Sequence, residues 1–219
     1  MSIKFYFDTI SPYAWLAWRP LVDISTRHNI VLEPVPVLFA GLLKANGQLG
    51  PAEIPRKRLW LIKDVMRRAD SQGLKVLAPP THPFNPLLPL RVLSLDMDIK
   101  IKQNLTQSLL DGAWQDGKDI SNQDVVANYC DMVGLNGKEC VQKAMEDIEV
   151  KERVKKQTED AVAAGVFGVP TTSVDGELFW GSEIDTMNHI ESALLRDDPI
   201  DLNVYNRWKD ITPSAVRKR

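Results

Sequence analysis

The chain has 219 residues, of which 44% are hydrophobic and 26% are charged, and its formal net charge is -2. This length and apolar content suffice for one compact domain, or for one domain that carries a large insertion. The balance of acidic and basic residues argues against a nucleic-acid-binding protein. No apolar run approaches the roughly 18 residues that cross a bilayer, and no signal-peptide pattern follows Met1. We therefore expect a soluble cytoplasmic protein without a membrane partner.

The two cysteines, Cys130 and Cys140, lie in segments whose pattern predicts helix. They form neither a CxxC motif nor a spacing that is typical of zinc sites. We expect unreactive, buried thiols and no metal site.

The first forty residues predict a strand, a helix and a second strand. Residues 3–7 are rich in β-formers and predict the first strand. Ser11-Pro12 then predicts a helix start, because serine is a strong N-cap and proline suits the first helical position. This helix is expected to end near His28. Residues 30–38 predict a second strand, and its two prolines indicate an edge position or an early end.

From about residue 41 to residue 165 the pattern predicts helices throughout. One helix is expected over 86–97 and another around Leu105. Ser121 and Asp124 predict a capping pair that opens a further helix, which Gly134 ends. A last long helix is expected from about Lys138 toward residue 165.

The C-terminal part predicts two strands and a helix. Residues 171–174 and 177–180 predict a hairpin joined by the two-residue turn Asp175-Gly176. Ser182 and Asp185 predict the start of a final amphipathic helix. We therefore divide the chain into a discontinuous α/β domain (1–40 and 165–200), a helical insertion domain (41–164) and a polar C-terminal tail (201–219).

This order of elements, with Pro170 before the third strand, resembles the thioredoxin fold. The large helical insertion after the second strand resembles its DsbA-like branch. The implied fold class is α/β, a thioredoxin-like sheet with a large all-helical insertion. Redox members of that fold carry a CxxC motif at the start of the first helix. The sequence at that place is Ser11-Pro12-Tyr13-Ala14, which excludes disulfide exchange by thiols of the protein at this position.

Two stretches carry a more specific resemblance, FYFDTISPYA at residues 5–14 and GVFGVPT at 165–171, the second followed by GELFWG at 176–181. They resemble motifs of 2-hydroxychromene-2-carboxylate isomerases and kappa-class glutathione transferases, and the resemblance covers nearly the whole chain. It implies glutathione as cofactor, a cis Val169-Pro170 bond, a small-molecule substrate and a homodimer.

Ser11 is the candidate catalytic residue. A helix N-terminus presents free N–H groups and favours an anion, and a thiolate placed there has a depressed pKa. A serine needs an adjacent base to act as a nucleophile, and His28, His82 and His189 all lie far from Ser11 in the sequence. We therefore interpret Ser11 as a hydrogen-bond donor to the thiolate of bound glutathione. The alternative is an ordinary N-cap serine.

The resemblance places the other glutathione contacts near the C-terminal motif: Val169, Pro170, Trp180, Gly181, Ser182 and Glu183. The backbone of Val169 is expected to pair like a strand with the cysteine of the tripeptide. The Ser182 hydroxyl suits the γ-glutamyl carboxylate, and Glu183 suits the ammonium group. The sequence departs from the family here, since Asp is usual at position 183 and Arg is common where Ile184 stands. Trp180 is equally well explained as a plain hairpin aromatic.

The resemblance implies substrate contacts at Lys44, Glu53, Phe84 and Asn85. Relatives carry Asn at the position of Glu53, so the acidic side chain puts the substrate itself in question. The basic residues Lys63, Arg67 and Arg68 are interpreted as a solvated helix face rather than a clamp for a carboxylate.

The leading hypothesis is a glutathione-dependent cis-trans isomerase that acts on 2-hydroxychromene-2-carboxylate or on a similar intermediate of aromatic degradation. One alternative is a kappa-like glutathione transferase that conjugates electrophiles. An alternative of another class is a non-catalytic thioredoxin-like binding module.

Overall fold

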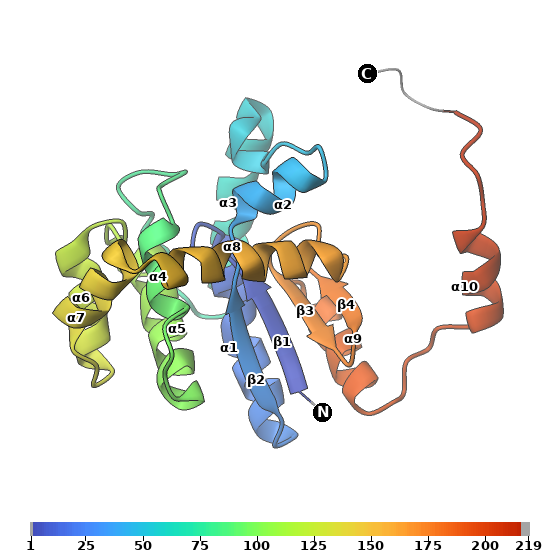
Figure 1. Ribbon diagram of the computed structural model, residues 1–219. Coiled ribbons are helices and arrows are strands. Elements are labelled where there is room, and N and C mark those ends of the chain that lie inside the picture. Colours follow the sequence, from blue (N-terminus) through green and yellow to red (C-terminus); the bar gives the residue numbers. More distant parts are fainter. Residues whose placement is uncertain (1, 216–219) are drawn as a thin grey trace.

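A mixed four-stranded sheet forms the centre of the protein (Figure 1), of which a computed structural model describes residues 2–215. Its strands are β1 (Ser2–Phe7), β2 (Val31–Pro36), β3 (Thr171–Val174) and β4 (Glu177–Trp180), in the order β2-β1-β3-β4. β2 is parallel to β1, whereas β3 is antiparallel to β1 and β4 is antiparallel to β3. The central strand therefore has one neighbour from the N-terminal part of the chain and one from the C-terminal part.

Two helices, α1 (Pro12–Arg27) and α9 (Ile184–Leu194), cover one face of this sheet. Successive side chains of a strand point to opposite faces. Phe5 and Phe7 of β1 accordingly join Trp18 of α1 in the larger core cluster, and Tyr6 packs with Ala161 in a smaller cluster on the other face. β2 lies at the edge of the sheet, which confirms the interpretation of its two prolines.

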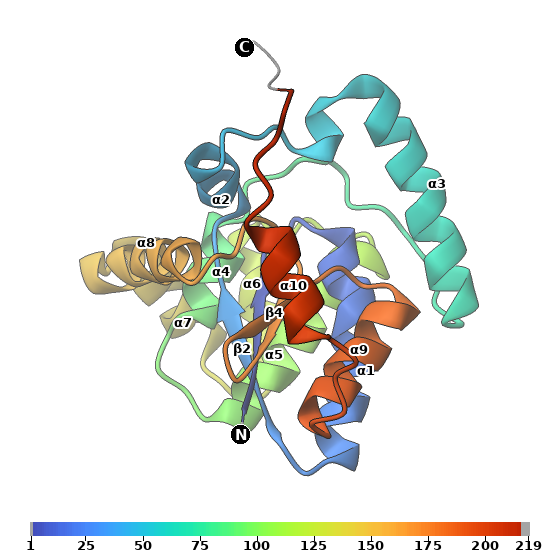
Figure 2. The same cartoon turned by 90° about the vertical axis from the view of Figure 1, so that its right-hand side faces the viewer.

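The segment between β2 and β3 is mainly helical, as the sequence predicts, and its longest stretch without a helix is residues 72–86. Figures 1 and 2 show α2 and α3 at the end of the sheet where β1 leads into α1, with α8 crossing in front of the sheet in Figure 1. The elements of the segment are α2 (Phe39–Ala45), a short 3-10 turn (Pro51–Glu53), α3 (Pro55–Ser71), α4 (Leu87–Leu93), α5 (Ile99–Trp114), α6 (Gln123–Met132), α7 (Gly137–Glu146) and α8 (Ile148–Ala163).

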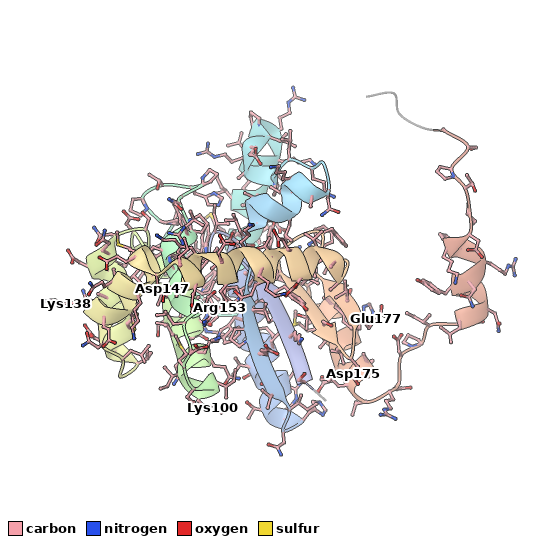
Figure 3. The ribbon with its side chains drawn as sticks, in the orientation of Figure 1. Lys100, Lys138, Asp147, Arg153, Asp175 and Glu177 are labelled. Carbon is pink, nitrogen blue, oxygen red and sulfur yellow. The ribbon has the colours of Figure 1, made fainter. Side chains whose placement is uncertain are left out.

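Several predicted helix boundaries are wrong. The long helix expected from Lys138 is two helices, α7 and α8, which meet at Asp147 (Figure 3). The backbone of Asp147 is extended, and its carboxylate accepts a hydrogen bond from the N–H of Glu149, so it caps α8. Asn122, not Ser121, caps α6, because the Ser121 hydroxyl bonds to Asp119 instead. Helix α9 begins at Ile184, with Glu183 rather than Ser182 at its N-cap.

The tail also contains structure that its polar composition did not predict. Asp201 caps a short helix, α10 (Leu202–Lys209), whose apolar residues are exposed. Figure 1 shows α10 apart from the rest of the molecule, at the end of an extended segment. None of the helices in residues 2–215 has the length and apolar character needed to cross a membrane.

Candidate functional site

The loop between β1 and α1 is fixed by hydrogen bonds to distant parts of the chain. One carboxylate oxygen of Asp8 accepts from the N–H of Ile10 at 3.0 Å, and the other accepts from the N–H of Phe39, the first residue of α2, at 2.9 Å. The indole N–H of Trp114 donates to the carbonyl of Thr9 at 3.0 Å. Asp8 is fully buried, and burial raises the pKa of its carboxyl to about 7. The loop that carries Ser11 is thus held rigidly.

Ser11 lies at the N-cap of α1, as predicted. Its Oγ accepts a hydrogen bond from the N–H of Ala14 at 3.3 Å, and its side chain is almost buried. Within residues 2–215 its hydroxyl hydrogen has no acceptor. The hydroxyl is therefore free to donate to an anion that lies at the N-terminus of α1, where unpaired N–H groups also point.

Ser11 opens into a cavity of about 440 Å³ between the thioredoxin-like part and the helical insertion. Most of its lining is apolar, and its polar side chains include Glu53 from the short 3-10 turn and His82 from the segment without helix. Phe84 lines the same cavity. The size and the apolar walls suit a small organic molecule.

His82 is a site residue that the sequence did not reveal. Its Nε2 lies 3.1 Å from the carbonyl oxygen of Ile10, and its ring packs edge-on against Trp114 with 5.2 Å between centroids. Burial lowers its pKa, so the ring is neutral near neutral pH. Nε2–H donates to the carbonyl, which leaves Nδ1 as a hydrogen-bond acceptor. No local motif could have signalled this contact, because it depends on the folding of the insertion.

A second cavity, of about 930 Å³, adjoins the first and shares Tyr13 and Val169 with it. Trp180, Gly181, Ser182 and Glu183 line this second cavity, as do Lys57 and Arg68 of α3. The structure thus places the residues expected to bind glutathione along one continuous depression that begins at Ser11. The Val169-Pro170 bond is cis, as predicted.

A hydrogen-bonded network joins α1, α3 and α9 at the wall of the second cavity. The Tyr13 hydroxyl donates to Asp64 at 2.8 Å, and Arg68 pairs with the same carboxylate at 2.7 Å and with Glu183 at 2.8 Å. The guanidinium of Arg68 also lies over the Tyr13 ring, 5.4 Å from its centroid. Burial and the neighbouring Asp64 raise the pKa of Tyr13, so its hydroxyl stays protonated. The interpretation of Arg68 as part of a solvated face is therefore wrong.

Two features beside Glu183 suit a ligand. The Ser182 Oγ is buried and has no hydrogen-bond partner in the described part of the chain, which is costly unless a ligand supplies one. Gly181 has φ +123°, and a Cβ at this position would lie 2.2 Å from the Glu183 carboxylate. A glycine is therefore required for the carboxylate to fold back and accept from the N–H of Ser182, at 2.9 Å.

Only two of the four residues expected to contact the substrate line the same cavity as Ser11. Glu53 and Phe84 line the Ser11 cavity. Lys44 lines a separate cavity between α2, α4 and α8, and the exposed Asn85 accepts from the N–H of Leu87 at 3.0 Å. Adjacent residues of α2 point to its two sides, which explains why Leu43 reaches the Ser11 cavity and Lys44 does not.

The cysteines lie outside both cavities. Cys130 is buried, and burial raises the pKa of its thiol to about 12; the half-buried Cys140 lies beside it. Residues 2–215 contain no cluster of His, Cys, Asp and Glu side chains that is suited to a metal ion.

Residues 2–194 match the family model described as a DSBA-like thioredoxin domain. The chain belongs to this family. It is similar to the 2-hydroxychromene-2-carboxylate isomerase of Sphingobium xenophagum, with 28% identity over 202 residues that cover 89% of this chain and 98% of the relative. It is also similar to human glutathione S-transferase kappa 1, with 24% identity over 234 residues that cover 100% of this chain and 97% of the relative.

Among solved structures, that of a 2-hydroxychromene-2-carboxylate isomerase superposes with a TM-score of 0.82 at 22% identity, covering 96% of this chain and all of the other. This similarity confirms the predicted fold class, the DSBA-like thioredoxin fold with its helical insertion.

Proposed function

We propose that the protein is a glutathione-dependent enzyme in which Ser11 stabilises the glutathione thiolate for addition to an electrophilic small molecule. The observation that carries this proposal is the free hydroxyl of Ser11 at the N-terminus of α1, inside a cavity that continues to the unpartnered Ser182 Oγ. The names of the relatives, isomerases and glutathione transferases, support it.

Glutathione fits the chemistry of the second cavity. Its two carboxylates need cations and hydroxyl donors, which Lys57, Arg68 and Ser182 offer. Its ammonium group needs an acceptor, and the carboxylate of Glu183 is half exposed beside the cavity. When bound, glutathione would supply a thiol that becomes a nucleophile on losing its proton. The Ser11 hydroxyl and the N–H groups of the first turn of α1 would favour the ionised form.

Two outcomes of the addition define two activities. Expulsion of the thiolate after rotation about the attacked bond gives an isomerase, of the type that acts on 2-hydroxychromene-2-carboxylate. Loss of another group from the substrate gives a transferase of the kappa type. One observation favours the transferase: among the described residues, no lysine or arginine lines the cavity at Ser11 to pair with a substrate carboxylate.

The proposal is tested by the pKa of bound glutathione, measured from the ultraviolet absorbance of the thiolate across pH. Ser11→Ala removes one hydrogen bond to a charged acceptor, worth about 1.5–3 kcal/mol, so the thiol pKa should rise by about one to two units. Ser108→Ala on α5, whose hydroxyl bonds only to the Asn104 carbonyl, is the matched control and should leave the thiol pKa unchanged. An unchanged pKa in Ser11→Ala would refute the role of this serine.

The second cavity is tested separately by calorimetry. Ser182→Ala should weaken glutathione binding about 10- to 100-fold, since it removes a hydroxyl that would bond to a carboxylate. The stability of the free protein should hardly change, because this Oγ has no partner to lose in the described chain. If the wild-type protein does not bind glutathione at millimolar concentration, the enzyme proposal fails and the binding-module alternative gains support.

A further inference from the structure

The Ser11 cavity is lined by acidic side chains but not by the basic side chains of lysine or arginine in the described chain. Asp8 and Glu53 are the acidic side chains that line it, and His82 lines it as well. Asp8 is buried, with both carboxylate oxygens engaged by backbone N–H groups. His82 presents a neutral ring whose Nδ1 is an acceptor.

The exposed Glu53 adds a negative charge to the lining of this cavity. One of its carboxylate oxygens accepts from the N–H of Gly50 at 2.6 Å, and this bond holds the side chain in place at the short 3-10 turn. Within residues 2–215, Glu53 forms no salt bridge. Its negative charge is therefore not paired with a basic side chain of the described chain. Its second oxygen is available to accept from a ligand.

Four of the nearby cations face other cavities, whereas the exposed Arg58, whose charge adds to burial in lowering the pKa of His82, lies outside the lining of the Ser11 cavity. Lys44 and Arg91 line the cavity on the other side of α2. Lys57 and Arg68 line the second cavity, where the proposed function places glutathione and its own two carboxylates. The end of the depression at which an electrophile would meet the thiolate is therefore the end that no lysine or arginine of residues 2–215 lines.

A second anionic group, beside the thiolate, is poorly accommodated in such a place. A carboxylate that enters a mostly apolar cavity loses its hydration, and the described lining of this cavity offers it no lysine or arginine in return. The carboxylate of Glu53 repels it in addition, although the exposure of Glu53 to solvent weakens this repulsion. A hydroxyl or an amide N–H is instead favoured in this cavity, because Glu53 and His82 both offer hydrogen-bond acceptors.

We propose that the electrophile which this protein accepts beside Ser11 is uncharged and carries a hydrogen-bond donor, such as a hydroxyl or a primary amide, and that carboxylate-bearing electrophiles are rejected. This inference rests on the proposed function and narrows it. It separates this chain from an enzyme whose substrate, like 2-hydroxychromene-2-carboxylate, carries a carboxylate.

A matched pair of aryl chlorides tests the inference, 4-chloro-3-nitrobenzamide and 4-chloro-3-nitrobenzoate. In each reaction the thiolate forms a C–S bond and chloride leaves with the electrons of the C–Cl bond, so no other reactant is needed. The kcat/KM of each compound is divided by its uncatalysed rate constant with glutathione, which removes the difference in intrinsic reactivity. The wild-type protein should prefer the amide at least about tenfold on this scale.

Glu53→Gln separates the charge from the cavity shape, because the glutamine keeps an oxygen that accepts from Gly50. The variant should raise the kcat/KM for the benzoate, divided by its uncatalysed rate constant, several-fold. The preference for the amide over the benzoate should therefore become smaller. Glu177→Gln is the matched control, since this glutamate lies on the β3–β4 hairpin at the far end of the sheet from α2 (Figure 3). The control should keep the wild-type preference.

The outcomes distinguish this inference from the proposed function. Glutathione binding and turnover with no preference for the amide, or with a preference for the benzoate, would overturn the inference alone. If neither chloride is turned over, calorimetry of the glutathione complex with the unreactive 3-nitrobenzamide and 3-nitrobenzoate measures the same discrimination, and equal binding or no binding of the two overturns the inference. Absence of glutathione binding would overturn the proposed function itself.

Discussion

Asp8 makes the stability of the protein depend on pH in an unusual direction. Its carboxyl ionises near 3.8 in an unfolded chain, whereas burial raises its pKa to about 7 in the folded protein. Between these values the unfolded state releases a proton that the folded state keeps, so the free energy of unfolding decreases as pH rises. The contribution of Asp8 to the free energy of unfolding is fully present below about pH 4 and is lost by about pH 7.

We therefore expect Asp8→Asn to remove the decrease in the free energy of unfolding that accompanies a rise in pH. Urea titrations across the window from about pH 4 to pH 7 give the free energy of unfolding of both proteins. The wild-type value should fall relative to that of the variant, even though the variant is less stable at acidic pH because an amide cannot accept from both Ile10 and Phe39. Parallel pH profiles of the two proteins would show that Asp8 does not titrate in this range.

Individual site residues differ in how far the sequence reveals them. Ser11 is predictable because its role as a cap depends on neighbours in the chain. The position of His82 depends on the carbonyl of Ile10 and the ring of Trp114, which only the folded insertion brings together. The partners of Glu183 were missed for the same reason: Arg68 reaches it from α3, and Gly181 lets its carboxylate turn back.

At the level of elements, Asp147 decides where one helix ends and the next begins. Its carboxylate satisfies the N–H of Glu149 at the start of α8. We expect Asp147→Ala to lower the free energy of unfolding by about 1 kcal/mol, the usual cost of losing an N-cap, measured by chemical denaturation.

The matched comparison for this prediction is Ser121→Ala. This hydroxyl bonds to the exposed Asp119 and does not cap α6, so its loss should change stability by less than about 0.5 kcal/mol. An effect of Ser121→Ala that equals or exceeds that of Asp147→Ala would contradict both capping assignments.

At the scale of the whole molecule, the edge position of β2 was predictable, since its two prolines are tolerated at the edge of a sheet. The division into domains stays a prediction. The position of α10 was not predictable, because its exposed apolar residues give no burial pattern.

Removal of residues 199–219 tests how far α10 supports the remainder of the chain. Helix α10 makes no extensive contact with any other described element, so the melting temperature should change by less than about 2 °C, measured by calorimetry. A drop of more than about 5 °C would show that the tail stabilises the fold. The homodimer remains a prediction of the resemblance, and sedimentation of both forms at equal concentrations measures it.

The central position of β1 has a consequence for synthesis of the protein on the ribosome. β2 emerges soon after β1 and covers one of its edges, but β3, the partner of the other edge, is made only after more than a hundred further residues. Until then β1 exposes unpaired N–H and carbonyl groups, which is a risk for association with other nascent chains. The ligand depression also needs both Ser11, which precedes α1, and Ser182, which follows β4. Binding of a ligand across both therefore reports that translation and folding have reached the last strand.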